Sequence, residues 1–359
     1  MSCCSFTHKN GGKRFRSRTI CLFLVLLTVI ALITGQAFGI TALKNFYLQD
    51  PDTVDVLVVG SSPTRSGINT NVLWEEFGIA CYNLNGPEEP YWITYYILQE
   101  AIKTQTPKLI ILDAKAAIYP DDYCSQIRII TNTFDIASWE NRRSAISASL
   151  ENQEELQAYV DAAWEYQRTG VIQSKILMAN DRDSSWKGYY EVDIVDPHER
   201  PSFVWNDEKR AINPREEEYV RKIFEMVNGW GIPLLLVAMP NPDYAYDHRY
   251  FNTLWEIADE YGIDHINYND FNMRFGLRYN SNFADWQHLN VKGGIIFTRQ
   301  FGKDLRERYD LPDRRGDPKY ASYDECARIW LEKYPTFESS DPEHQPLDWF
   351  SNPAPSPGE

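Results

Sequence analysis

The sequence is poor in cysteine. Only six cysteines occur in 359 residues, and just three of them, Cys81, Cys124 and Cys326, follow residue 21. Three cysteines without framework spacing form at most one internal disulfide, so a disulfide scaffold is excluded. Cys81 lies inside an apolar strand pattern and is expected to be a buried, inert thiol. The length allows one large or two ordinary domains, each with its own core.

Positive charge is also scarce. The chain has 36 Lys and Arg against 51 Asp and Glu, a formal net charge of −15. The basic residues before residue 44 have no acidic counterpart there, so the rest of the chain is more acidic still. A phosphate backbone would be repelled, which excludes a nucleic-acid function. No Cys, His and carboxylate cluster has metal-ligand spacing, so we expect neither a metal nor a cofactor.

Long apolar runs are absent except for one near the start. Residues 20–43 carry no charge, and a helix of this length, at about 1.5 Å per residue, spans a hydrocarbon core of about 30 Å. We predict a cytoplasmic basic tail at residues 1–18, a transmembrane anchor at 19–43 and an extracytoplasmic body. The alternative is a signal peptide cleaved near Ala37-Phe38-Gly39. Both alternatives export the body.

The body has the pattern of an α/β fold. Short apolar runs predict five strands, and helical periodicity separates several of them. Strands this apolar indicate a mainly parallel five-stranded sheet covered on both faces, a three-layer, flavodoxin-like sandwich. The predicted strands are 54–60, 79–84, 108–113, 233–239 and 263–267, and the predicted helices are 91–103, 214–228, 249–261 and 291–309.

We assign residues 44–310 to this domain, with an insertion at about 120–212 that is helical around 151–168. Residues 311–359 are expected to form a C-terminal extension that is partly disordered. Aromatic residues of the insertion form a small core or, alternatively, stack on sugar rings. They are Trp139, Trp164, Trp186, Tyr189, Tyr190 and Trp205. The acidic runs Glu88-Glu89, Asp121-Asp122 and Glu216-Glu217-Glu218 are expected to be solvated.

Candidate chemistry lies where strands end, because ligands of open parallel sheets bind at their carboxyl edge. The first predicted strand runs into Gly60-Ser61-Ser62-Pro63. A serine on such a turn can be a nucleophile whose backbone N–H also forms half of an oxyanion hole. The same motif is common as a plain turn or a helix cap.

A nucleophilic serine needs a base, and His288 is the best candidate. It lies between the fifth strand and the closing helix, on the edge where Ser62 is expected. Asp285, three residues earlier, can orient the imidazole, so the Ser62 and His288 side chains should lie about 2.6 to 3.2 Å apart. His248 stays open as an alternative. Position disfavours the other four, His8, His198, His265 and His344.

These two blocks resemble the SGNH (GDSL-type) hydrolase superfamily. The resemblance rests on Gly60-Ser61-Ser62 and on Asp285-Trp286-Gln287-His288. It implies Ser62 as nucleophile, His288 as base, Asp285 as its support, and backbone oxyanion donors at Ser62 and Gly86. Ser61 stands where the family usually has Asp, and whether Ser61 or Ser62 is the nucleophile stays open. The family's Gly-x-Asn-Asp block is missing, because the third strand continues into Asp113-Ala114-Lys115.

The anchor and the degenerate third block are similar to a narrower, membrane-anchored subgroup. It includes the D-alanyl transfer protein of teichoic acid modification and polysaccharide O-acetylation proteins. This resemblance implies an acyltransferase for a cell-envelope polysaccharide or teichoic-acid-like polymer, with a membrane-bound O-acyltransferase as the acyl-donating partner. It also places Arg65 and Asn85 among candidate substrate-binding residues, although a solvated or sheet-edge role for Arg65 is an alternative.

Two other functions remain open at this stage. A membrane-anchored carbohydrate esterase would use the same residues with water as acceptor. A non-catalytic envelope assembly protein would keep only the fold.

Overall fold

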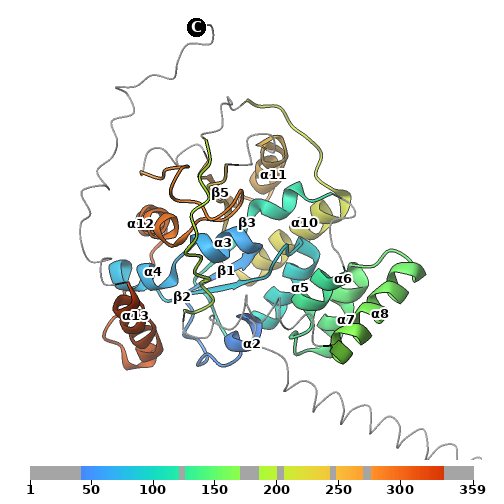
Figure 1. The fold of residues 1–359 in the computed structure, drawn as a ribbon, viewed down its shortest axis with the longest axis horizontal. Coiled ribbons are helices and arrows are strands. Elements are labelled where there is room, and N and C mark those ends of the chain that lie inside the picture. The colour runs from blue at the N-terminus through green and yellow to red at the C-terminus, as the bar shows by residue number, and fades with distance from the viewer. Residues whose placement is uncertain are drawn as a thin grey trace, which may run out of the picture.

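The computed structural model describes residues 42–120, 126–169, 186–199, 206–242, 248–269 and 276–334 (Figure 1). The predicted anchor lies outside this part of the chain except for Ala42 and Leu43, which are buried in helix α2 (Ala42–Phe46). No helix within the described ranges is long and apolar enough to cross a membrane. Asp121, Asp122, Trp205 and residues 335–359 also lie outside the described residues.

The centre of the fold is a sheet of five parallel strands in the order β2-β1-β3-β4-β5. Every strand end lies within two residues of the predicted one, which confirms the α/β fold with a five-stranded parallel sheet. Central β1 pairs with β2 on one side and with β3 on the other. The strands are β1 (Val56–Gly60), β2 (Cys81–Asn85), β3 (Leu109–Asp113), β4 (Leu234–Ala238) and β5 (Asp264–Asn267).

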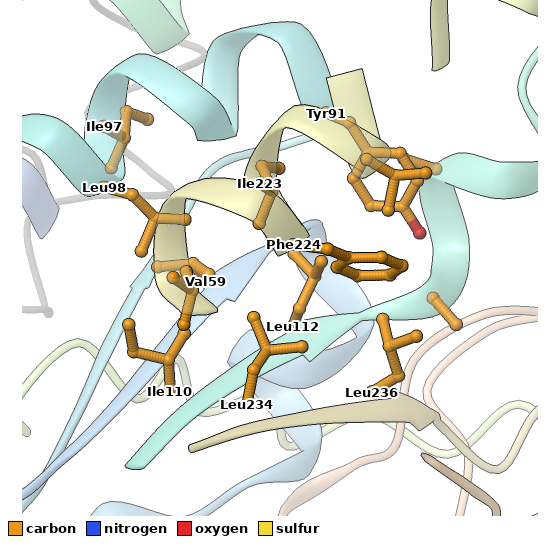
Figure 2. Close-up of a cluster of buried hydrophobic side chains, with 14 of the residues drawn as sticks. Val59, Tyr91, Ile97, Leu98, Ile110, Leu112, Ile223, Phe224, Leu234 and Leu236 are labelled. Carbon is orange, nitrogen blue, oxygen red and sulfur yellow. The ribbon is translucent and has the colours of Figure 1, made fainter. Parts of the chain in front are cut away.

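Side-chain alternation along each strand divides the core into two layers. In β1, Val56 and Val58 pack into one layer, while Leu57 and Val59 pack into the other. Figure 2 shows part of the second layer, where Leu112 lies below Phe224 and Val59 lies between Leu98 and Ile110. Both faces of the sheet are therefore buried, as the apolar strand sequences require.

Helices cover both faces. One layer contains α4 (Thr70–Phe77) and α12 (Val291–Arg308). Helix α12 contacts both α4 and α3 (Ser62–Gly67). The opposite layer contains α5 (Tyr91–Ala101), α10 (Pro214–Trp230) and α11 (His248–Glu260). The 3-10 helix η1 (Ala114–Ile118) follows β3 directly.

The insertion begins with three helices, α6 (Gln126–Thr133), α7 (Trp139–Ala148) and α8 (Gln153–Thr169). Helix α7 packs against α5, so these helices continue the α5 side of the molecule (Figure 1). Trp139 and Trp164 are exposed there.

Beyond residue 310 the chain stays packed on the domain. The 3-10 helix η3 (Pro318–Tyr320) leads into α13 (Ala321–Lys333), which lies against α4. Tyr320 and Tyr323 stack on Trp74. The first part of the predicted extension is therefore folded onto the same body.

Residues 186–199, here called the strap, run in extended form across the α3 side of the sheet (Figure 1). Trp186 and Tyr189 bury their rings against Trp330 of α13. Gly188 crosses β2 so closely that a Cβ atom there would lie 1.9 Å from the Asn83 carbonyl oxygen, and its φ is +80°. These two aromatic residues of the insertion thus belong to a small core.

Candidate active site

The nucleophile turn is shaped by its glycine. Gly60 ends β1 with φ +116°, and a Cβ atom there would lie 2.8 Å from Asp113 Cβ on the neighbouring strand. Ser61 follows in extended conformation, and Ser62 is the first residue of α3. The turn therefore places the Ser62 side chain at the carboxyl edge of the sheet, partly accessible to solvent.

The base is held by a short loop between β5 and α12. Phe283 and Leu289 form an antiparallel bridge, and the Ala284 N–H donates to the His288 carbonyl oxygen at 2.8 Å, which closes the loop. Inside it, Asp285 Oδ1 accepts the backbone N–H groups of Gln287 and His288 at 2.7 and 2.9 Å. The position of the Asp285 carboxylate is thus fixed by the backbone, independently of the His288 ring.

The three predicted side chains lie in one hydrogen-bonded chain. His288 Nε2 lies 2.8 Å from Ser62 Oγ, within the expected range, and His288 Nδ1 lies 2.8 Å from Asp285 Oδ2. A carboxylate only accepts hydrogen bonds, so Nδ1 carries the proton and Nε2 is left to accept the Ser62 O–H. This is the arrangement that general-base activation of a serine requires.

The electrostatics favour an ionised Asp285. Partial burial raises the pKa of its carboxyl, but the hydrogen bond and charge of His288 and the two backbone N–H donors outweigh burial, and the pKa is lowered. The side chain is about half exposed, at 52%. Asp285 therefore stays negative and can stabilise an imidazolium at position 288.

Ser61 is placed differently from its neighbour. It is only 1% exposed, and its Oγ lies 2.7 Å from the Tyr119 hydroxyl. Its carbonyl oxygen accepts the Thr64 hydroxyl, as expected of a residue that caps the turn. Of the two serines, only Ser62 has its hydroxyl against the histidine.

The structure does not support Gly86 as an oxyanion donor. Its N–H donates to the Gly60 carbonyl oxygen at 3.1 Å and lies beside the buried carboxyl of Glu89. The Ser62 N–H, by contrast, begins α3 and has no acceptor within that helix. Asn85, opposite Gly60 in the sheet register, is buried and donates one Nδ2 hydrogen to Thr64 Oγ1 at 2.8 Å.

Arg65 is buried rather than solvated. It is 6% exposed, and its guanidinium lies over the Tyr190 ring at 4.7 Å. The Tyr190 N–H also donates to the Arg65 carbonyl oxygen. Arg65 therefore ties α3 to the strap.

Asp113 occupies the place of the missing third block. It is buried, and its Oδ1 accepts the Lys115 N–H at 3.1 Å. Burial raises the pKa of Asp113 to about 7, although the Lys115 N–H, the Lys115 charge and the Ser61 backbone act in the other direction. This residue supports the turn from beneath and offers no amide donor.

Two of the remaining histidines take part in other interactions. His248 is buried at the start of α11, with Nε2 3.0 Å from Asn206 Oδ1. His265 lies on edge strand β5 rather than in the core, stacked on Trp255.

Sequence reasoning missed two buried carboxyls. Glu89 and Glu216, assigned to solvated acidic runs, are 1% and 0% exposed. Thr94 donates to Glu89 and the Tyr91 N–H donates to Glu216. Burial raises the pKa of Glu89 to about 8, against the lowering effect of Thr94 and Gly86, and raises that of Glu216 well above its ordinary value. The Pro90 that follows Glu89, and the Asn213-Pro214 helix start beside Glu216, were the available signals of ordered backbone.

His198 lies in the insertion, so its place in the sequence does not point to the active site. The strap places His198 against the active-site loop, where the centroid of its ring lies 4.2 Å from the centroid of the Trp286 ring. The strap makes backbone hydrogen bonds to β2, to α3 and to the loop around His288. The pairs are Asn83–Lys187, Arg65–Tyr190, Val192–Val291, Asp196–Phe283 and His198–Tyr279.

Comparison with known proteins gives one structural likeness and no family. No known family and no curated protein matches the sequence. Among solved structures, the chain is similar to a crystal structure of a putative acylhydrolase from Bacteroides fragilis. The two share 11% identity over 74% of this chain and 94% of the other, with a TM-score of 0.38. The chemistry of this site therefore has to be judged from its own side chains.

Proposed function

We propose that the protein is an SGNH-type serine acyltransferase that modifies a polysaccharide or similar polymer of the cell envelope. The observation that carries the proposal is the unbroken hydrogen-bonded chain from Ser62 through His288 to Asp285. Ser62 and His288 are 226 positions apart in the sequence. A turn with a purely structural role does not require an imidazole hydrogen-bonded to its serine.

The first half-reaction forms an acyl-enzyme. His288 Nε2 takes the Ser62 proton as Ser62 Oγ attacks the acyl carbonyl of the donor. The imidazolium, stabilised by Asp285, then gives that proton to the leaving group. In the second half-reaction, a hydroxyl of the acceptor polymer loses its proton to His288 and attacks the ester carbonyl. The bond from the acyl carbon to Ser62 Oγ then breaks, and His288 returns the proton to Ser62 Oγ.

The tetrahedral intermediate needs donors for its oxyanion. The Ser62 N–H is one, since the first helical residue has no intrahelical acceptor. The second hydrogen of Asn85 Nδ2 is a reasonable second donor, because Thr64 Oγ1 takes only the first. In this chain Asn85 would replace the donor that the family draws from its third block.

We further propose that the body is extracytoplasmic and held at the membrane by residues 19–43. An anchored enzyme can receive acyl groups from a membrane-bound O-acyltransferase that passes them across the bilayer. Hydrolysis by a carbohydrate esterase shares the first half-reaction and differs only in using water as acceptor.

Ser62→Ala and Ser61→Ala test the proposal as a matched pair. With p-nitrophenyl acetate as donor, Ser62→Ala should abolish the burst of p-nitrophenol, and a serine-reactive phosphonate should label Ser62 in the wild-type protein. Ser61→Ala should still be labelled. Equal turnover by wild type and Ser62→Ala would eliminate the covalent mechanism, and labelling of Ser61 would show that the nucleophile is its neighbour. Absence of both burst and label in the wild type would favour the assembly-protein alternative.

A further inference from the structure

Trp286 is a large aromatic side chain that the active-site loop leaves exposed. It lies between Asp285 and His288 in sequence and is 57% exposed. Burying such a ring would remove more apolar surface from water than burying almost any other side chain. Its exposure on the loop that carries His288, two residues from that histidine in sequence, therefore calls for an explanation.

The indole of Trp286 is held by packing. The ring of His198, whose side chain is 2% exposed, lies 4.2 Å from it and supports one side. His198 is itself held, because its N–H donates to the Tyr279 carbonyl oxygen and its ring also contacts Phe283. The strap thus fixes the orientation of an exposed aromatic ring, which is the condition for binding a ligand without a large ordering cost.

The strap and the active-site loop, which hold the ring, carry both apolar and polar side chains. Ile194 and Val195 of the strap are exposed next to the residues that pair with the active-site loop. Gln287 follows the indole in sequence and carries an amide side chain that can donate and accept hydrogen bonds. A pyranose ring matches this mixture, since it offers a C–H face to an aromatic ring and hydroxyl groups to its polar neighbours.

A lipid occupant fits the topology less well. The described chain begins at α2, and Tyr47 just after it bonds to Glu100 near the end of α5. Helix α5 starts at the carboxyl edge of the sheet and ends at the opposite edge, whereas Ser62 lies at the carboxyl edge. A retained anchor would therefore join the body about one strand length, roughly 16 Å, from the active-site edge.

We propose that Trp286, supported by His198, is a sugar-binding platform for a neutral glycosyl unit of the polymer at the acyl-accepting or acyl-bearing position. This inference rests on the proposed function of the Ser62 site. Trp286 would thus determine which sugar binds at the active site, and it would not contact the acyl group.

The test compares esters that differ in one part. Acetylated xylo-oligosaccharide carries a sugar, p-nitrophenyl acetate carries none, and p-nitrophenyl octanoate carries a long acyl chain. Trp286→Ala should lower kcat/KM for the acetylated oligosaccharide about tenfold relative to its effect on p-nitrophenyl acetate, mainly through KM. Trp286→Tyr should restore most of the loss. Leu48→Ala, at an exposed apolar side chain just after α2, is the control and should change kcat/KM for neither the acetylated oligosaccharide nor p-nitrophenyl acetate.

The outcomes separate this inference from the function itself. Loss of p-nitrophenyl acetate turnover in Ser62→Ala, together with no selective effect of Trp286→Ala, would overturn the sugar platform and leave the serine mechanism standing. A selective effect on the octanoate ester would overturn it in favour of an acyl-chain surface. Failure of the wild type to act on the acetylated oligosaccharide while cleaving p-nitrophenyl acetate would also refute it. Ser62-independent turnover would instead refute the proposed function.

Discussion

The contacts of Asp285 predict that its replacement by asparagine is more harmful than its replacement by alanine. Asp285 Oδ1 accepts two backbone N–H groups, from Gln287 and His288, at 2.7 and 2.9 Å. In Asp285→Asn the amide oxygen should keep this position, since only an oxygen can accept both bonds. The amide nitrogen then takes the place of Oδ2, which lies 2.8 Å from His288 Nδ1. The amide oxygen stays 2.9 Å from the same nitrogen, but it already accepts two backbone N–H groups, and a proton on Nδ1 would also face the amide N–H donor.

A donor facing Nδ1 reverses the tautomer of the ring. Nδ1 becomes the acceptor, the proton moves to Nε2, and Nε2 no longer accepts the Ser62 O–H. Loss of the reactive tautomer costs about 10⁴ in kcat, or about 5.5 kcal/mol. Asp285→Ala leaves the tautomer free and removes a charge-assisted hydrogen bond worth about 1.5 to 3 kcal/mol, which is about 10- to 10²-fold. Water can enter beside this half-exposed position and reduce the loss further.

Single-turnover release of p-nitrophenol from p-nitrophenyl acetate measures the acylation rate of both variants directly. We expect wild type to be fastest, Asp285→Ala intermediate and Asp285→Asn slowest. Thermal unfolding serves as the folding control, and Asp285→Asn should be the more stable variant because it keeps the two backbone contacts. An asparagine variant as active as the alanine variant would refute the tautomer argument.

Three further results are expected. Gly188→Ala should destabilise the protein by about 1 to 3 kcal/mol in thermal unfolding and also slow acylation, because a Cβ at φ +80° meets the Asn83 carbonyl oxygen and displaces the strap; unchanged stability would contradict the close approach. Glu89 has a folded pKa of about 8 against an ordinary 4.5, so its contribution to stability is complete below pH about 4.5 and is lost as the pH rises through about 8. In Glu89→Gln the unfolding free energy should accordingly fall less between pH about 4.5 and about 8 than in the wild type. If denaturant titrations at several pH values give the same fall for both proteins, Glu89 is not protonated in the folded state. Finally, the full-length protein should fractionate with membranes, whereas a soluble form starting near residue 40 would show that the N-terminal segment is cleaved.

The sequence by itself was sufficient for the sheet and for naming Ser62, His288 and Asp285 as the first candidates, while Ser61 and His248 stayed open as alternatives. Each strand is buried on both faces, so it appears as a short apolar run that needs no knowledge of its neighbours. Parallel strands bring their carboxyl ends to one edge, which makes the residues after β1 and before α12 meet. Ser62 and His288 could therefore be paired across 226 positions from local patterns alone.

Tertiary structure alone decided which polar groups are buried and what the insertion contacts. Glu89 and Glu216 carry the same local signal as solvated acidic residues, and only packing against α5 and its neighbours removes them from water. The Gly86 N–H was a sound candidate in sequence, but the Gly60 carbonyl oxygen takes it in the folded sheet. His198 and Trp286 are 88 positions apart and become neighbours through the strap. The extended backbone of the strap forms hydrogen bonds with backbone N–H and C=O groups of the active-site loop that need partners. Such contacts depend on the backbone in three dimensions, and backbone hydrogen bonds leave no mark on the identity of the side chains.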